Sequence, residues 1–307
     1  MSAKKPVVAK KATVKKATTK KATTKRVAVK KAATPKKTAK VKAPVAAPWS
    51  ITDALADERL QPSVRRALGN QNRFRTPRRV RTIMSHRYDV PVIFCVNNPD
   101  DRIHIRQTKG FFYEEDELAM MAEHMPKGGT FCDIGANVGN HSLYMLLKGG
   151  AGRVVPVEPN PDAISLLLSN MILNRVADRV ALETLGYGLD EGAADDRAIH
   201  APRENLGWAK LKKAGEGDDA ISVRAGDELF AGMQIDVLKM DVEGMEIGAL
   251  KGLKATIARC KPTMFIEVDT ANLDAFHALM DDYGYVVAHA FKATRVNQNF
   301  LVKPGAA

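Results

Sequence analysis

Residues 130–160 constrain the fold of this chain more than any other segment. An apolar run reaches Asp133, Gly135 and Gly139 then open a helix, and a second apolar run ends in Glu158. Glycine lets the backbone turn tightly and approach a ligand, and an acidic side chain at the tip of the next strand can accept both ribose hydroxyls. Glu158 lies 23 residues beyond Gly135, close to the spacing such a unit needs. The segment therefore predicts a nucleotide-holding βαβ unit.

The glycine pattern favours one class of nucleotide over another. It is Asp-x-Gly-x-x-x-Gly, not the Gly-x-Gly-x-x-Gly that seats a pyrophosphate on a helix N-terminus. Asp133 beside the turn would repel a phosphate and attract a cationic ammonium or sulfonium group. The pattern thus favours S-adenosylmethionine over NAD.

Strand-like and helix-like segments alternate from residue 88 onward. We expect a strand pair at Val90–Val96 and Arg102–Gln107, joined by a turn at Asn97–Asp100, and a helix at Glu115–His124. Further strands are expected at 130–135, 153–158, 180–186, 236–241, 263–268, 285–291 and 297–303, with extra strands near 196–202 and 221–224, and helices at 139–148, 161–174, 245–257 and 271–283. This alternation predicts an α/β fold with a mainly parallel sheet covered by helices on both faces.

Residues with functional side chains or small size fall at the ends of these expected strands. They are Asp133, Glu158, Gly186, Asp241 and Glu267. Ligands of open parallel sheets bind beyond the carboxyl ends of the strands. We therefore expect these residues to converge on one crevice.

The formal charge of +12 is unevenly distributed and divides the chain into three parts. Residues 1–48 carry +16, residues 49–87 carry +6, and the remainder carries −10. The first part is rich in Lys, Ala and Thr, lacks large apolar residues, and is expected to be a disordered basic tail. The second is expected to be an arginine-rich lead-in with short helices at Asp53–Arg59 and Ser63–Leu68, and residues 88–307 are the expected catalytic domain. The arginines of the lead-in form an anion-binding surface, or else a solvated helix face or a face that packs against the acidic core.

Cysteine usage and hydropathy bear on the compartment. Cys95, Cys132 and Cys260 are too few and too scattered for a disulfide framework or a metal cluster. No run reaches the roughly 18 apolar residues of a membrane span, and the lysine-rich start lacks the apolar centre of a secretory signal. We expect a cytoplasmic protein without a transmembrane segment.

Several motifs resemble the FkbM-type methyltransferases. They are DIGANVGNHS at 133–142, EPNP at 158–161, NLG at 205–207, LKMDVEGME at 238–246, LKG at 250–252 and FIEV at 265–268. The resemblance covers roughly residues 88–303. It implies a class I, Rossmann-like three-layer fold with a mostly parallel seven-stranded sheet and an antiparallel final strand. It also implies S-adenosylmethionine as cofactor and methyl transfer mostly to hydroxyl groups of sugars or small natural products.

The expected cofactor site follows the βαβ unit. Asp133, Gly135 and Gly139 should shape the loop around the methionine part of the cofactor, with Asn137 and Asn140 supplying polar contacts. Glu158 should hold the ribose. Leu185 and Gly186 are expected along the adenine, or else as an ordinary packed strand end.

The expected reacting groups lie near the fourth strand. A weakly nucleophilic hydroxyl benefits from a nearby base, and the candidates are Asp241, Glu243, Glu267 and His141. We favour Asp241 or Glu243, with His141 third, and expect Lys239 to pair with one of the acids. Glu246 and Glu267 are further candidates for the substrate side, although an acid early in a helix can also serve only as a cap. No metal is expected, because no histidine joins the acids at ligand spacing.

Two functions remain open alongside a third, non-enzymatic one. The leading hypothesis is O-methylation of a small-molecule or glycan hydroxyl, with Trp208 either stacking on the acceptor or covering the sheet edge. The alternative is a nucleic-acid-directed methyltransferase, acting on ribose rather than on bases, whose tail captures the polyanion. The tail itself could bind nucleic acid, an anionic membrane surface or another acidic polymer, or only tune solubility. A chromatin-like packaging protein with a degenerate domain is the third hypothesis, and an intact cofactor pocket would exclude it.

Overall fold

The computed structural model describes residues 50–69, 80–200, 210–213, 215, 220–291 and 293–306, and its centre is a six-stranded sheet. The strands lie in the order β11 (Tyr285–Phe291), β12 (Asn297–Pro304), β10 (Thr263–Asp269), β9 (Val237–Met240), β3 (Thr130–Ile134) and β4 (Arg153–Val157). The last four are mutually parallel, and β12 is antiparallel to both of its neighbours. The expected mostly parallel sheet with an antiparallel final strand is confirmed.

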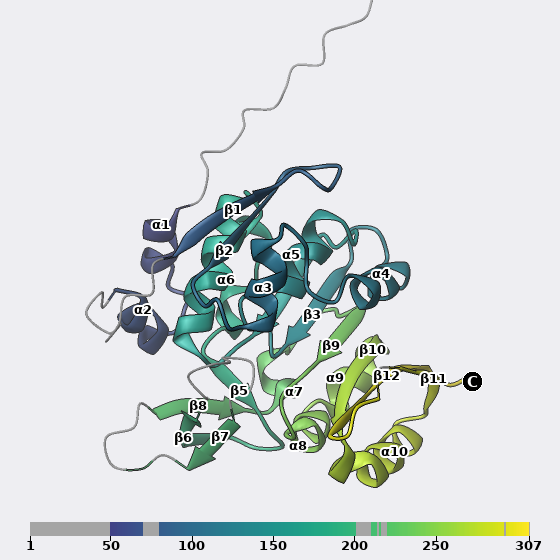
Figure 1. Cartoon of the computed structure of the whole chain (residues 1–307). Helices are drawn as coiled ribbons and strands as arrows, with labels where there is room; N and C mark the ends of the chain where they lie inside the picture. The colour runs from purple at the N-terminus through teal and green to yellow at the C-terminus, as the bar shows by residue number, and fades with distance from the viewer. Residues whose placement is uncertain are drawn as a thin grey trace, which may run out of the picture. The chain divides into compact units, whose positions relative to one another are not determined.

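Helices cover both faces of this sheet (Figure 1). Because side chains alternate along a strand, Phe131 packs on one face and Cys132 on the other. The first face is covered by α4 (Glu115–Glu123), α5 (Asn140–Leu147) and α6 (Pro161–Leu173), and the second by α8 (Glu246–Lys251), α9 (Lys254–Cys260) and α10 (Leu273–Asp282). The result is the expected Rossmann-like three-layer sandwich.

The seventh strand expected at 180–186 does not form as a ladder. The segment contacts β4 through two isolated bridges, Val154 with Val180 and Glu158 with Leu185, and a short 3-10 turn at Leu182–Thr184 separates them. Pro156 in β4 has no N–H group for a neighbouring strand, and its carbonyl instead accepts the Thr184 hydroxyl at 2.6 Å. The order of the layers is unchanged, but this edge is held by two backbone hydrogen bonds, from Ala181 N–H to the Val154 carbonyl and from Gly186 N–H to the Glu158 carbonyl, together with the Thr184 hydroxyl.

The segment before the sheet corrects a second expectation. The strand β2 (Val92–Val96) pairs antiparallel with β1 (Arg81–Ser85), which lies in the arginine-rich stretch, and not with residues 102–107. Those residues form helix α3 (Arg102–Thr108), because the Asp101 carboxylate caps it by accepting the N–H groups of Ile103 and His104.

The lead-in packs with the rest of residues 47–307 as one compact unit. Its helices are α1 (Ile51–Ala56) and α2 (Pro62–Gly69), and the buried Leu60 and Val64 belong to the main core. The basic tail expected at 1–48 and the arginines at 73–79 lie outside the described residues.

A smaller sheet flanks the main one and carries one wall of the site. Its order is β5 (Tyr187–Leu189), β8 (Ala220–Arg224), β6 (Ala194–His200) and β7 (Lys210–Lys213), followed by the short helix α7 (Gly226–Leu229). The single helix expected at 245–257 is split into α8 and α9 near Gly252, where a Cβ atom would lie 2.2 Å from the Asp190 carbonyl oxygen. Within the parts of the chain that the structure describes, no helix is long and apolar enough to cross a bilayer.

Candidate active site

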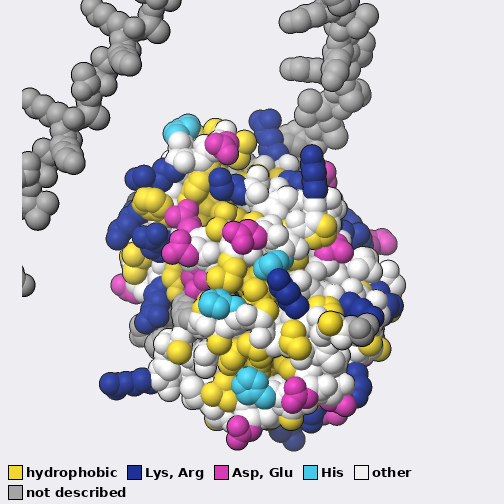
Figure 2. Space-filling view, turned by 90° about the vertical axis from the view of Figure 1, so that its right-hand side faces the viewer, with side chains coloured by type: hydrophobic (Ala, Val, Ile, Leu, Met, Phe, Trp, Pro, Cys, Tyr) yellow, Lys and Arg dark blue, Asp and Glu magenta, His cyan; other side chains and the backbone are white. Residues whose placement is uncertain are grey.

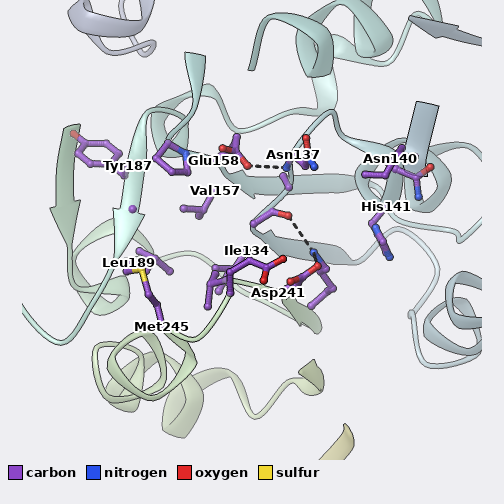
Figure 3. A pocket seen from close by; sticks show the side chains of 18 of the residues that line it. Ile134, Asn137, Asn140, His141, Val157, Glu158, Tyr187, Leu189, Asp241 and Met245 are labelled. Atoms are coloured by element: carbon purple, nitrogen blue, oxygen red, sulfur yellow. Dashed lines mark hydrogen bonds and ion pairs between the residues drawn. The ribbon is translucent and has the colours of Figure 1, made fainter. Parts of the chain in front are cut away.

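A cleft of about 870 Å³, counted out to its open mouth, lies at the carboxyl ends of β3, β4 and β9 (Figure 3). Its wall includes the loop after β3, the tip of β4, strand β5 and residues 239–245 after and within β9. This is the place where an open parallel sheet binds its ligand. The crevice expected from the strand ends is therefore present, although only some of the expected residues line it.

The loop after β3 depends on two glycines with positive φ. Gly135 has φ +76°, and a Cβ atom there would lie 1.9 Å from the Asp241 carbonyl oxygen. Gly139 has φ +77°, and its Cβ would meet Leu167 at 2.9 Å. Only glycine fits both positions, so the loop lies directly against the end of β9 and against α6.

Glu158 is held at the tip of β4 by the same loop. Its carboxylate accepts the backbone N–H groups of Asn137 and Asn160, both at 2.8 Å. The side chain lines the cleft and is 7% exposed. Burial raises the pKa of Glu158 to about 7, against the opposing effect of these two hydrogen bonds.

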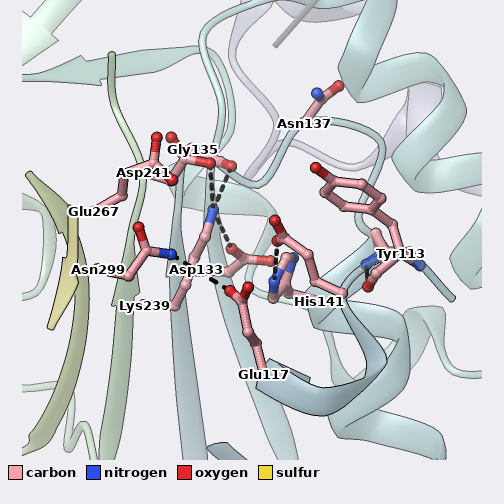
Figure 4. Close-up of polar contacts among 12 residues, drawn as sticks. Tyr113, Glu117, Asp133, Gly135, Asn137, His141, Lys239, Asp241, Glu267 and Asn299 are labelled. Carbon is pink, nitrogen blue, oxygen red and sulfur yellow. Dashed lines mark hydrogen bonds and ion pairs between the residues drawn. The ribbon is translucent and has the colours of Figure 1, made fainter. Parts of the chain in front are cut away.

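Lys239 joins the loop to the end of β9 (Figure 4). Its ammonium donates to the Gly135 carbonyl at 3.1 Å and lies 3.6 Å from the Asp133 carboxylate and 3.7 Å from that of Asp241. Burial opposes its charge, but Asp241 and Asp133 outweigh that effect and raise the pKa of Lys239. The expectation that Lys239 pairs with a strand-end acid is confirmed for Asp241.

Asp133 does not line the cleft, which corrects its expected contact with the cofactor. Its carboxylate is fully buried beneath the loop and accepts both the N–H and the hydroxyl of Ser142, at 3.0 and 2.7 Å. The negative charge of Asp133 thus interacts with the first turn of α5 and with Lys239. Asp133 supports the loop and does not itself face a ligand.

Asn140 and His141, at the start of α5, are both buried in the cleft wall. The Asn140 amide exchanges hydrogen bonds with the backbone N–H and carbonyl of Tyr113, each at 3.0 Å, so it positions the chain before α4. His141 lies 3.5 Å from the Glu114 carboxylate. Burial and the charge of Lys239 lower the pKa of His141 to about 3, which disfavours it as the base.

The cleft wall at β5 differs from the pair of residues expected there. Leu185 and Gly186 do not line the cleft, since Leu185 is fully buried and Gly186 packs against Val64. Tyr187 and Leu189 of β5 line it instead, with Gly188 between them.

Of the expected reacting acids, Asp241 and Glu243 line the cleft. The Asp241 side chain is 37% exposed. Glu246 does not line the cleft, because its carboxylate is buried and accepts the Asp269 N–H and the Asn272 amide, each at 2.8 Å. Trp208 lies outside the described residues.

Three polar side chains beside Asp241 and Lys239 form a second group, which we call the polar cluster: Glu117 of α4, Glu267 of β10 and Asn299 of β12 (Figure 4). Glu267 was expected near the site, whereas Glu117 and Asn299 were not. Neither carries a sequence signal, since one lies inside an amphipathic helix and the other in a strand far along the chain. Among the described residues, no group of three or more His, Cys, Asp or Glu side chains is arranged to hold a metal ion.

Comparison with known proteins decides the family. Residues 133–287, just over half of the chain, match the methyltransferase FkbM domain. The chain belongs to the FkbM methyltransferase family. The sheet order described above agrees with the class I fold expected of this family.

Two curated relatives are similar to part of the chain. Hexuronic acid methyltransferase AglP of Haloferax volcanii is 30% identical over 165 residues, which cover 52% of this chain and 63% of that protein. Methyltransferase sdnD of Sordaria araneosa is 27% identical over 163 residues, covering 42% of this chain and 62% of that protein. The FkbM chain described here therefore spans less than two thirds of the length of either relative.

Among solved structures, one similar chain is the methyltransferase FkbM of Methylobacillus flagellatus KT. It is 24% identical, with a TM-score of 0.41, and the similarity covers 56% of this FkbM chain and 43% of that one.

Proposed function

We propose that this protein is an S-adenosylmethionine-dependent methyltransferase that acts on a hydroxyl group of a sugar, a glycan or a small natural product. The observation that carries the proposal is Glu158, an acid oriented by the glycine loop within the cleft of an FkbM domain. The two curated relatives, a hexuronic acid methyltransferase and the methyltransferase sdnD, support a sugar or natural-product acceptor.

The residues of the cleft fit S-adenosylmethionine. Asn137 Oδ1 is buried at the cleft and has no hydrogen-bond partner within the protein, so it can accept a hydrogen bond from a ligand. Glu158 would hold the ribose hydroxyls, and Tyr187 and Leu189 would lie along the adenine. Asp241 and Glu243 give this cleft the negative charge that suits a cation.

When bound, this cofactor supplies a methyl group on a sulfonium, which is already a good leaving group. The protein then has to align the acceptor oxygen and remove its proton. Asp241 is the exposed acid beside the cleft that could accept this proton, with Glu243 as the second candidate. His141 is a poor base, because a pKa of about 3 leaves little driving force for taking up a proton.

Methyl transfer into fractionated cell material tests this proposal. Purified protein and labelled S-adenosylmethionine are incubated with glycan, lipid, small-molecule and nucleic-acid fractions, and an Asp241→Asn variant serves as the inactive control. We expect label in the glycan or small-molecule fraction. Label confined to nucleic acid would overturn the assignment in favour of the alternative.

Nucleic-acid-directed methylation is not favoured, because neither curated relative is named for a nucleic acid. A role for the basic tail in binding a polyanion stays a prediction, as does the division into tail (1–48), lead-in (49–87) and catalytic domain (88–307). We also propose a cytoplasmic, reducing environment, supported by the free thiols of Cys95, Cys132 and Cys260.

A further inference from the structure

The polar cluster adjoins the cleft through Asp241 and Lys239. Asp241 and Lys239 line the cleft, and their charges act on both Glu117 and Glu267. In Figure 4 the side chains of Glu117, Glu267 and Asn299 gather around the same lysine. None of these three residues lines the cleft itself, so an acceptor would meet them by extending past Asp241 toward β10 and β12.

Asn299 is the strongest sign that the cluster receives a ligand. Its side chain is buried, with 8% of the residue exposed, and its Nδ2 group donates to Glu117 at 3.4 Å. Its Oδ1 atom is buried and has no hydrogen-bond partner. Buried polar atoms of folded proteins are nearly always satisfied, so this oxygen calls for an O–H or N–H donor from outside the chain.

The two carboxyl groups limit which donors can enter. Burial, and after it a neighbouring carboxylate, raise the pKa of both Glu117 and Glu267 to about 7: Glu267 acts on Glu117, and Asp241 on Glu267. Near neutral pH these groups can accept or donate hydrogen bonds to hydroxyls. A carboxylate or phosphate would instead face like charges. Lys239, the cation that acts on both groups, is already bound by Gly135, Asp133 and Asp241.

We propose that Glu117, Glu267 and Asn299 form the acceptor subsite and select a polyhydroxylated acceptor that carries no carboxylate or phosphate at the end that enters. This inference rests on the proposed function and deepens it. The proposed acceptor differs from the one in the name of the hexuronic acid methyltransferase, because the end of the acceptor that enters this subsite would be neutral.

Matched sugar pairs test the proposal. Binding of methyl α-D-glucopyranoside and methyl α-D-glucuronopyranoside, and of the corresponding galactose pair, is measured by saturation-transfer NMR on the full chain loaded with S-adenosylhomocysteine. We expect the neutral member to bind roughly tenfold or more tightly in at least one pair. In Glu117→Gln and Glu267→Gln this preference should fall several-fold, because each variant removes one negative charge and keeps the shape. Asp274→Asn, which removes a charge from the exposed face of α10, should keep the wild-type preference.

The outcomes separate this inference from the proposed function. Equal or tighter binding of the uronates by the wild type would overturn the selectivity, as would an unchanged preference in both glutamine variants that still bind S-adenosylhomocysteine. If the loaded protein bound neither member of any pair, the sugar-like acceptor assigned to this cluster would be wrong, while the cofactor site would stand. If the wild type failed to bind S-adenosylhomocysteine, the proposed function itself would fall, and the acceptor subsite with it.

Discussion

Replacing Gly135 by alanine tests the geometry of the loop after β3. A Cβ atom at this position would lie 1.9 Å from the Asp241 carbonyl oxygen, on a backbone with φ +76°. Gly150 offers a matched control, because its φ is +84° and a Cβ atom added there would have no neighbour within 4 Å. The pair Gly135→Ala and Gly150→Ala therefore separates the cost of the backbone conformation from the cost of the steric clash.

The expected magnitudes differ clearly. A left-handed backbone costs an L-residue about 1–2 kcal/mol, so Gly150→Ala should lower the free energy of unfolding by about that amount. In Gly135→Ala the Cβ atom must also gain about 1.5 Å to reach ordinary contact, and such overpacking typically adds about 1–3 kcal/mol. We therefore expect a total loss of about 2–5 kcal/mol.

Urea unfolding measures the two losses, and calorimetry with S-adenosylhomocysteine measures their effect on the cleft. Only Gly135→Ala should weaken binding, since of the two residues only Gly135 lies in the wall of the cleft. Equal stability losses in the two variants, or unchanged binding in Gly135→Ala, would refute the close packing of the loop against β9.

The remaining predictions concern the acids and the histidine. Glu158→Ala should weaken S-adenosylhomocysteine binding by about 1–3 kcal/mol by calorimetry, the usual loss of hydrogen bonds to a charged group, whereas Glu191→Ala on the surface should not. The folded-state pKa of Glu117 is raised from 4.5 to about 7, so its contribution to stability falls as pH rises through that window. Glu117→Gln should therefore be less destabilising at pH 8 than at pH 5 in urea unfolding. Equal effects at the two pH values would contradict the burial of Glu117. Asp241→Asn should lower kcat by about 10²–10⁴-fold, while His141→Gln should leave the shape of the pH–rate profile unchanged between about pH 6 and 9. Loss of a pH limb in His141→Gln would restore the histidine as the base.

The sequence was sufficient for features that depend on local pattern. The glycine loop, the position of Glu158 at a strand tip and the alternating strands and helices are encoded over short stretches, and the structure confirms this arrangement. The pairing of β2 was not predictable in this way. Residues 102–107 alternate like a strand, yet the single carboxylate of Asp101 caps a helix there. The bridged edge beside β4 likewise depends on one proline and one threonine hydroxyl that meet only in the folded chain.

In the candidate site, too, features of local pattern could be predicted and features that depend on distant residues could not. Strand-end acids can be located from the sequence, but whether a carboxylate faces a ligand or the protein depends on distant partners. Asp133 is turned to Ser142 and Lys239, and Glu246 to Asp269 and Asn272. Asn299 lies beside Glu117 through a hydrogen bond between residues that are 182 positions apart in the chain. Such long-range pairings leave no periodic signal.

The surface of the molecule carries charged side chains of both signs among apolar and neutral ones on the face shown in Figure 2. The ammonium of Lys239, by contrast, is buried, and its contacts limit which substitutions around it can act independently. One cation is shared between the carbonyl of Gly135, in the loop after β3, and the carboxylate of Asp241, which lines the cleft. A substitution that shifts Gly135 or Asp241 changes the strength of the interaction between Lys239 and the other residue. Under the proposed function, affinity for the methyl donor and placement of the acceptor hydroxyl are therefore thermodynamically coupled, so substitutions on the two sides should have non-additive effects.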